Sequence, residues 1–176
     1  MKFEGNHLYI FSGLPGTGKT TLAKSLASHL EAVFLRVDTV EQGIRDLCNF
    51  NVQGEGYRLW YRIAADNLRL GNSVVADSCN PIKLTRHEWQ EVAFSTDSSY
   101  TNIEVICSDS EEHKKRINER KCDIPGMGLP SWKDVEEREY DSWDGGRILI
   151  DTANKNSVES FNELLSKLNM SHKNGN

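Results

Sequence analysis

A glycine-rich stretch near the N-terminus constrains the fold of this chain more than any other feature. Residues 13–20 read GLPGTGKT and match G-x-x-x-x-G-K-[ST] at every fixed position. A short apolar run, HLYIF at 7–11, precedes the pattern, and Leu22, Leu26 and Leu30 follow it with helical spacing. A strand that leads through a glycine-rich loop into a helix N-terminus binds phosphate groups and is typical of α/β folds with a parallel sheet.

The residue types in this phosphate loop (13–20) suit a polyanion with a metal ion. Glycines let successive N–H groups turn inward, and the helix N-terminus that follows favours negative charge. Lys19 is expected to bridge the terminal phosphates, and Thr20 to place a hydroxyl on Mg²⁺. We predict that a nucleoside triphosphate, expected to be ATP, binds here with Mg²⁺, and we leave the choice between ATP and GTP open. The residues expected to bind it are Gly13, Pro15, Gly16, Thr17, Gly18, Lys19, Thr20 and Thr21.

The rest of the chain repeats the alternation of strand and helix. Apolar runs predict four more strands, at 33–37, 73–77, 102–107 and 147–151, with helical patterns between them. Strands that alternate with helices predict a parallel sheet covered on both faces, that is, a three-layer α/β sandwich. Capping-box patterns mark three expected helix starts. These pairs are Thr39 with Gln42, Ser108 with Glu111, and Asn156 with Glu159.

The length of 176 residues suits one substantial core, so we expect a single domain with its core at about 7–169 and a polar tail at 170–176. Residues 122–146 interrupt the alternation with two of the four prolines and two of the four tryptophans. This composition predicts a lid-like insert. Trp132 is interpreted as an anchor of the insert, whereas the roles of Arg138 and Trp143 stay open.

Composition and charge indicate which kinds of partner and which cellular compartment to expect. The net charge of −5 argues against generic nucleic-acid binding, because that affinity rests on clustered Lys and Arg. No window approaches the roughly 18 consecutive apolar residues of a membrane span, and the N-terminus lacks a signal-peptide pattern. The four cysteines are far apart without C-x-x-C, which argues against zinc and against a disulfide framework. We therefore expect a cytoplasmic protein without a membrane partner.

Two acids are expected at the sheet edge that carries the phosphate loop. Asp38 comes at the end of the second predicted strand, and Asp77 ends the third. Asp38 could accept the proton of a substrate hydroxyl during γ-phosphoryl transfer; the alternative is an acid that favours a helix dipole. Asp77 could orient Mg²⁺ together with Thr20; the alternative is a strand-ending turn. Asn80 is a further candidate for a substrate contact.

Two arginines precede the insert with helical spacing. Arg116 and Arg120 stand four residues apart, which places both guanidinium groups on one helix face. From there they could neutralise charge on the transferring phosphoryl group and help exclude water. The alternative is a solvated surface helix, since Glu112 and Arg116 also form an i, i+4 pair.

Five segments in this order resemble the P-loop kinase family that includes polynucleotide kinase, zeta toxin and chloramphenicol phosphotransferase, and most of all its small bacterial members with an LPxW segment. The segments are GLPGTGKTTLA at 13–23, VD at 37–38, ADSCN at 76–80, R-x-x-x-R at 116–120 and LIDTA at 149–153. The resemblance spans about residues 7–169. Polynucleotide kinase itself fits poorly, because no basic channel and no domain that removes 3′ phosphates is visible.

The resemblance implies a fold of the P-loop NTP hydrolase and nucleotide kinase type, with a five-stranded parallel sheet in the order 2-3-1-4-5. It also implies Asp38 as the base, Asp77 in the Mg²⁺ region and the arginines of 116–120 as lid residues. The loop after the last strand would pack against adenine, which would place Asp151, Thr152 and Ala153 near the base.

We therefore expect an ATP- and Mg²⁺-dependent kinase that transfers the γ-phosphoryl group to a hydroxyl of a small-molecule acceptor. The catalytic residues would be Lys19, Asp38, Arg116 and Arg120. The alternatives are a nucleotide-dependent regulatory ATPase or switch, and a kinase of nucleic-acid ends or nucleotide-sugars. The sequence identifies neither the acceptor nor the oligomeric state.

Overall fold

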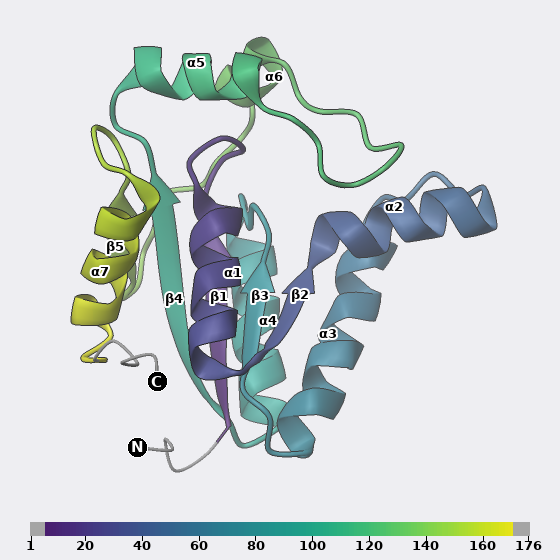
Figure 1. Cartoon of the computed structure of the whole chain (residues 1–176). Coiled ribbons are helices and arrows are strands. Elements are labelled where there is room, and N and C mark those ends of the chain that lie inside the picture. The colour runs from purple at the N-terminus through teal and green to yellow at the C-terminus, as the bar shows by residue number, and fades with distance from the viewer. Residues whose placement is uncertain (1–5, 171–176) are drawn as a thin grey trace.

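A computed structural model of the chain describes residues 6–170 as strands alternating with helices (Figure 1). The strands are β1 His7–Ser12, β2 Val33–Arg36, β3 Val74–Asp77, β4 Ser99–Ile106 and β5 Ile148–Asp151. The helices are α1 Lys19–Leu30, α2 Val37–Cys48, α3 Glu55–Arg69, α4 Lys83–Ser95, α5 Ser110–Glu119, α6 Trp132–Glu136 and α7 Ser157–Lys167. None of the helices within this range combines the length and apolar character that a membrane crossing requires.

The five strands form one parallel sheet in the order β2-β3-β1-β4-β5, which confirms the expected topology. The register sets Phe11 of β1 level with Asp77 of β3, and Asp77 level with Arg36 of β2. The carboxyl ends of three neighbouring strands therefore meet at one edge. The loops that leave this edge lie side by side, which is where parallel α/β sheets bind ligands.

Side chains alternate between the two faces of the sheet, and each face has its own core. Leu8 and Ile10 of β1 pack with α3 and α4, whereas Tyr9 and Phe11 pack with α1 and α7. All four side chains are buried. Because helices cover both faces, the apolar run of β1 is continuous instead of alternating with polar residues.

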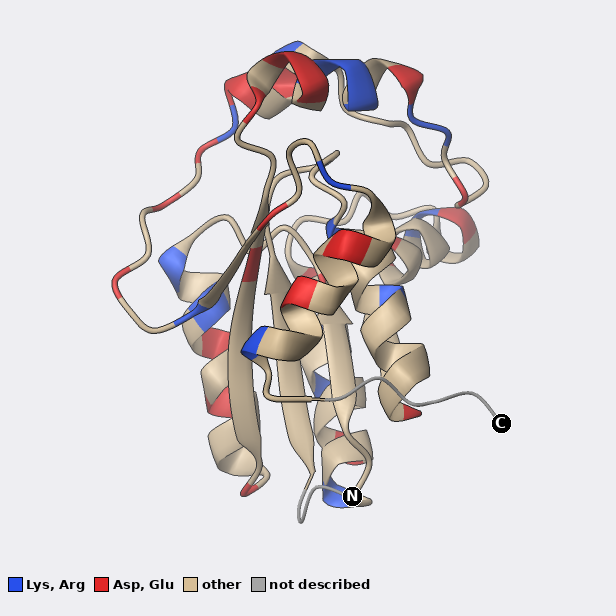
Figure 2. Cartoon of the chain, turned by 60° about the vertical axis from the view of Figure 1, so that its left-hand side comes forward, with Lys and Arg blue, Asp and Glu red and all other residues tan. Residues whose placement is uncertain are grey.

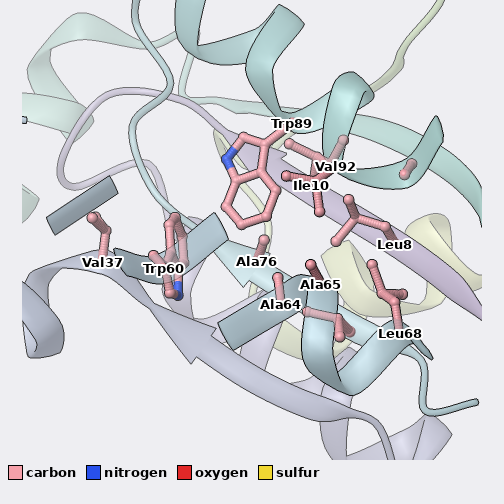
Figure 3. Packing of buried hydrophobic residues seen from close by; sticks show 12 residues of the cluster. Leu8, Ile10, Val37, Trp60, Ala64, Ala65, Leu68, Ala76, Trp89 and Val92 are labelled. Carbon is pink, nitrogen blue, oxygen red and sulfur yellow. The ribbon is translucent and has the colours of Figure 1, made fainter. Parts of the chain in front are cut away.

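Two tryptophans fill the centre of the core on the α3 and α4 side (Figure 3). Trp60 of α3 and Trp89 of α4 are both fully buried. Their rings meet edge to face, with centroids 4.8 Å apart and planes at 79°. This geometry is the favoured one for aromatic pairs, and it fixes α3 against α4 beneath the sheet edge.

Two of the three predicted capping boxes are wrong. The helix α2 begins at Val37 without a side-chain cap, so Asp38 lies in its first turn and not at the end of β2. The cap of α5 is Asp109, which accepts a hydrogen bond from the N–H of Glu112, one residue later than expected. The third box, Asn156 with Glu159, is confirmed in both directions at the start of α7.

The 122–146 insert crosses above the carboxyl edge of the sheet (Figure 1) and contains the short helix α6, which lies beside α5. A capping box between Ser131 and Asp134 starts α6. Blocks of acidic and basic residues follow one another along α5, and acidic residues predominate in the insert (Figure 2). The insert is thus folded over the edge at which β1, β2 and β3 end.

Candidate active site

The phosphate loop has the backbone that its glycines permit. Gly13 has a φ of +138°, and a Cβ on it would lie 2.2 Å from the carbonyl oxygen of Val105 in β4. Gly18 takes a left-handed φ of +89° at the N-cap of α1. The Gly13 N–H donates to the carbonyl of Cys79 at 3.0 Å, and the Thr17 hydroxyl donates to the carbonyl of Leu14 at 3.0 Å. These two hydrogen bonds therefore hold the backbone of the phosphate loop in place.

A buried ion pair lies at the end of the phosphate loop. Lys19 Nζ donates to Asp77 Oδ1 at 2.8 Å, and Asp77 is only 1% exposed. Burial opposes the charge on Lys19, but the Asp77 carboxylate outweighs it and holds the lysine pKa above its ordinary value. The structure thus brings two of the candidate site residues into direct contact.

The residues around Asp77 fit a Mg²⁺ ion bound together with phosphates. Asp77 Oδ2 is buried and has no hydrogen-bond partner among the described residues, which leaves one carboxylate oxygen available for a ligand. Thr20, at the start of α1, lines the adjoining cavity. Within residues 6–170 no group of three or more His, Cys, Asp or Glu side chains could hold a metal alone. An ion here would take its remaining oxygen ligands from water and from a bound phosphate group.

A cavity of about 1020 Å³ extends from the phosphate loop to α2 and under the insert. Asp38, in the first turn of α2, lines it, and Oδ2 of this residue lies 3.7 Å from Arg36 Nε. Its walls also include Pro15, Gly16, Gly18, Lys19, Thr20, Thr21, Glu41, Gln42, Arg45, Cys79, Arg116, Arg120, Met127 and Arg138. Lys19 and Asp38 thus border one cavity although they belong to different helices.

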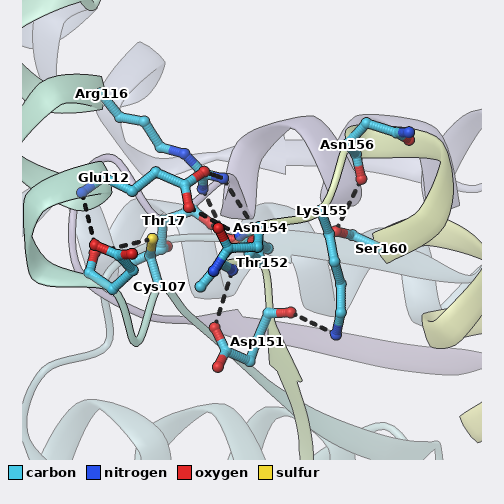
Figure 4. A network of polar contacts seen from close by, with 12 residues as sticks. Thr17, Cys107, Glu112, Arg116, Asp151, Thr152, Asn154, Lys155, Asn156 and Ser160 are labelled. Carbon is cyan, nitrogen blue, oxygen red and sulfur yellow. Dashed lines mark hydrogen bonds and ion pairs between the residues drawn. The ribbon is translucent and has the colours of Figure 1, made fainter.

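The two arginines expected on one helix face have different surroundings. Arg116 donates to the hydroxyl of Thr152 at 2.7 Å and to its carbonyl at 2.9 Å, and it pairs with Glu112 (Figure 4). Arg120 lies just beyond the end of α5 in extended backbone, so it does not continue the helix face. It lines the large cavity, and no ion pair to it is recorded within residues 6–170.

Thr152 connects the loop after β5 to the phosphate loop. Its hydroxyl donates to the carbonyl of Thr17 at 2.8 Å, and this contact lies beside a second cavity of about 190 Å³ (Figure 4). That cavity is lined by Gly16, Gly18, Thr21, Leu22, Arg116, Thr152, Lys155, Asn156, Ser157 and Ser160. Asp151 is not in its walls. Burial opposes the charge on Asp151, but bonds from Ser108 and Ala153 hold its pKa below the ordinary value.

A histidine that was not among the predicted site residues fixes the phosphate loop. His113 of α5 is buried, and its Nε2 lies 2.7 Å from the carbonyl oxygen of Pro15. Because a carbonyl only accepts, Nε2 carries the proton. The His113 ring also meets Trp132 edge to face at 5.2 Å, so Trp132 anchors the insert to α5. No local sequence pattern marks this contact, since the partners of His113 lie far away along the chain.

A second missed residue is the buried Arg86 of α4, which is 4% exposed. Its guanidinium donates to four carbonyls, two in the loop after β3 and two at the end of the insert. It also lies 4.9 Å from the ring centroid of Tyr140 and 4.2 Å from that of Trp143. Arg86 therefore fixes the insert to the loop that carries Cys79.

The nearby polar residues have structural partners as well. Asn80 is buried and its side-chain amide donates to the carbonyl of Phe11 at 2.9 Å, so this amide supports the sheet edge. Arg138 of the insert lies in the cavity wall with its guanidinium 3.8 Å from Cys79 Sγ. Burial raises the pKa of the Cys79 thiol.

Comparison with known proteins agrees with this architecture. A family model described as AAA domain matches residues 8–126. No curated protein sequence matches the chain significantly. A proposed kinase from Chloroflexus aurantiacus is similar in structure, with a TM-score of 0.71 and 19% identity over 96% of this chain and 100% of that one.

Two further solved structures resemble the chain. A gluconokinase from Sinorhizobium meliloti 1021 has a TM-score of 0.67 and 18% identity, over 96% of this chain and 94% of that one. The Mycobacterium tuberculosis APS kinase CysC, solved with AMPPNP and APS, has a TM-score of 0.67 and 15% identity, over 94% and 98% respectively. At these identities the likeness establishes the fold, a P-loop kinase fold.

Proposed function

The chain belongs to the AAA domain family, and from this premise we propose that it is an ATP- and Mg²⁺-dependent kinase for a hydroxyl group of a small molecule. The observation that carries the proposal is the shared cavity. Lys19, paired with the buried Asp77, lies at one side of it, and Asp38 lies at another without a hydrogen-bonded partner among the described residues. A phosphoryl donor and an acceptor can therefore meet between a cation and a base.

The chemistry assigned to the cavity is an in-line transfer. The acceptor oxygen bonds to the γ-phosphorus, the bond from that phosphorus to the β,γ-bridging oxygen breaks, and ADP leaves. Asp38 takes the proton from the attacking hydroxyl. Lys19 moves from Asp77 to the phosphate oxygens. Thr20 and Asp77 are the residues that would hold Mg²⁺, which would supply positive charge to balance that of the phosphates.

The arginines take separate parts in this proposal. Arg120 has no ion-pair partner recorded in the described part of the chain and stabilises the charge of the transferring group. Arg116 lines both cavities, so it contacts the nucleotide between its phosphates and its base. The smaller cavity beside Thr152 holds the base. Asp151 accepts hydrogen bonds from the N–H groups of Ser108 and Ala153 and so orders the loop that carries Thr152.

The test compares ADP release by the parent chain, Asp38→Asn and the control Asp66→Asn, whose carboxylate is exposed on α3. The panel holds small polyols, sugars, nucleosides, UDP-sugars and 5′-hydroxyl oligonucleotides. We expect acceptor-dependent ADP release that falls about 100-fold or more in Asp38→Asn alone, because removal of a general base costs about that factor. Calorimetry with ATP and Mg²⁺ should give the same affinity for all three proteins.

Other results would favour the alternatives. Tight ATP binding with slow hydrolysis, unaffected by any acceptor or by Asp38→Asn, would favour a nucleotide-dependent switch. Phosphorylation of only the oligonucleotides or the UDP-sugars would assign the acceptor to those classes. Failure of ATP to bind the parent chain would refute the kinase proposal entirely.

A further inference from the structure

The part of the large cavity that lies along α2 carries a pair of opposite charges. Glu41 and Arg45 line the cavity with Asp38, and all three come from successive turns of one helix. A helix rises about 1.5 Å per residue, so Glu41 lies roughly 4.5 Å along the axis from Asp38. A molecule with one hydroxyl at Asp38 would therefore present its neighbouring groups to Glu41.

The fold makes specific room for Glu41. A Cβ on Gly56, in the first turn of α3, would lie 2.3 Å from Glu41 Cγ, so a glycine at 56 lets the glutamate lie between the two helices. The side chain of Glu41 is 18% exposed, and burial raises its pKa. An apolar side chain would pack against α3 without the cost of burying a carboxylate, so packing alone does not explain an acid here.

The chemistry of the pair favours one kind of ligand. Glu41 Oε2 accepts from the Arg45 guanidinium at 3.2 Å, and Arg45 is also 3.5 Å from Gln42 Oε1. The pair is neutral as a whole and offers an acceptor beside a donor. A hydroxyl can donate to Glu41 and accept from Arg45 at the same time, so an uncharged hydroxylated ligand satisfies both members of the pair.

We propose that the acceptor is a neutral, hydroxyl-rich molecule of the polyol or sugar class, and that Glu41 and Arg45 bind a hydroxyl adjacent to the one that is phosphorylated. This inference rests on the proposed kinase function. Glu41 is then a residue that determines acceptor specificity, and Asp38 remains the base.

The test uses the full chain with ATP and Mg²⁺ and three sets of acceptors with equal carbon number: neutral sugars and polyols, sugar acids, and amino sugars. Steady-state ADP release is measured for the parent, the isosteric Glu41→Gln and the control Glu91→Gln, an exposed acid of α4. We expect turnover of a neutral compound, with KM raised about 10-fold or more by Glu41→Gln and kcat within about threefold. Glu91→Gln should match the parent.

A second variant keeps the carboxylate but displaces it. Gly56→Ala should raise the acceptor KM in the same direction while ATP affinity stays unchanged, since the added methyl group overlaps Glu41. Turnover of a sugar acid or an amino sugar in preference to the neutral set would overturn this inference and leave the kinase proposal intact, as would an unchanged KM in Glu41→Gln. Absence of acceptor-dependent ADP release in all three sets would overturn this inference. It would overturn the kinase proposal only together with the same result for the nucleosides, UDP-sugars and oligonucleotides of the first panel.

Discussion

Replacement of Arg86 by methionine tests how the insert is fixed to the sheet edge. The guanidinium donates to the carbonyls of Asn80, Pro81, Asp141 and Ser142 at 2.9–3.2 Å. Methionine matches the apolar stem of the arginine side chain, but it ends where the guanidinium begins and donates no hydrogen bond. Arg86→Met therefore removes the polar links between the insert and the loop after β3 while it keeps the packing of the stem.

The loss of stability in Arg86→Met depends on which of the four carbonyls water can reach. Asn80 is fully buried, so its carbonyl loses a partner at about 1–3 kcal/mol, whereas the other three belong to partly or fully exposed residues that water can reach. Loss of the cation over Tyr140 and Trp143 adds about 1 kcal/mol. We expect the free energy of unfolding to fall by about 3 kcal/mol, which corresponds to about 6–12 °C in Tm for a chain of this size.

Urea denaturation and limited trypsin digestion measure the two parts of this prediction. Arg86→Met should unfold at lower urea and should be cleaved faster after Lys133 and Arg138, both within the insert. Arg69→Met is the matched control, because Arg69 is exposed at the end of α3 and its change should cost at most about 0.5 kcal/mol. Equal stability of the two variants, or cleavage of Arg86→Met at the parental rate, would refute the reasoning.

Three further changes test the surroundings of the site. Gly18→Ala and Gly71→Ala place alanine at φ +89° and +86° without a close clash, so urea denaturation should show a loss of about 1–2 kcal/mol in the free energy of unfolding for each. Only Gly18→Ala should weaken ATP binding in calorimetry. Equal ATP affinities of the two variants would contradict this. Because burial raises the pKa of Cys79, iodoacetamide at pH 8 should modify it more slowly than the exposed Cys48 in peptide mass spectra; equal rates would count against it. Lys24 and Arg36 lower the pKa of Asp123, so the ionised carboxylate stabilises the fold above the pKa of the unfolded carboxyl, and this stabilisation declines as pH falls below about 4. The difference in free energy of unfolding between the parent and Asp123→Asn should therefore shrink as pH falls through that range. A constant difference would argue against the pairing.

Local patterns predicted the parts of the site that depend on neighbours in sequence. The phosphate loop needs glycines at fixed spacing between a strand and a helix, so the local sequence is enough to predict it at residues 13–20. The sheet order did not follow from the residues alone and came from the family resemblance. Asp38 lies near the expected sheet edge but in the first turn of α2 and not at the end of a strand, because Val37 continues an apolar run while already starting α2 without a capping side chain.

The misses share a physical origin. Ser108 and Asp109 are each followed three residues later by a glutamate, so spacing alone cannot decide between them, and only the fold selects Asp109. His113 contacts Pro15, which is 98 positions away in the sequence. Arg86 contacts Asp141 and Ser142, which are 55 and 56 positions away from it. Such contacts exist only after the sheet has assembled, so no window of sequence contains them.

The sheet order also bears on how such a protein can diversify. β2 and α2 lie at one end of the sheet, and β5 with α7 lies at the other, with β3, β1 and β4 between them. Substitutions on the α2 rim therefore leave the opposite rim untouched. On the proposed function, acceptor preference and donor preference can therefore evolve separately, and α2 and α3 can be redesigned for a new alcohol while residues 13–20 stay unchanged.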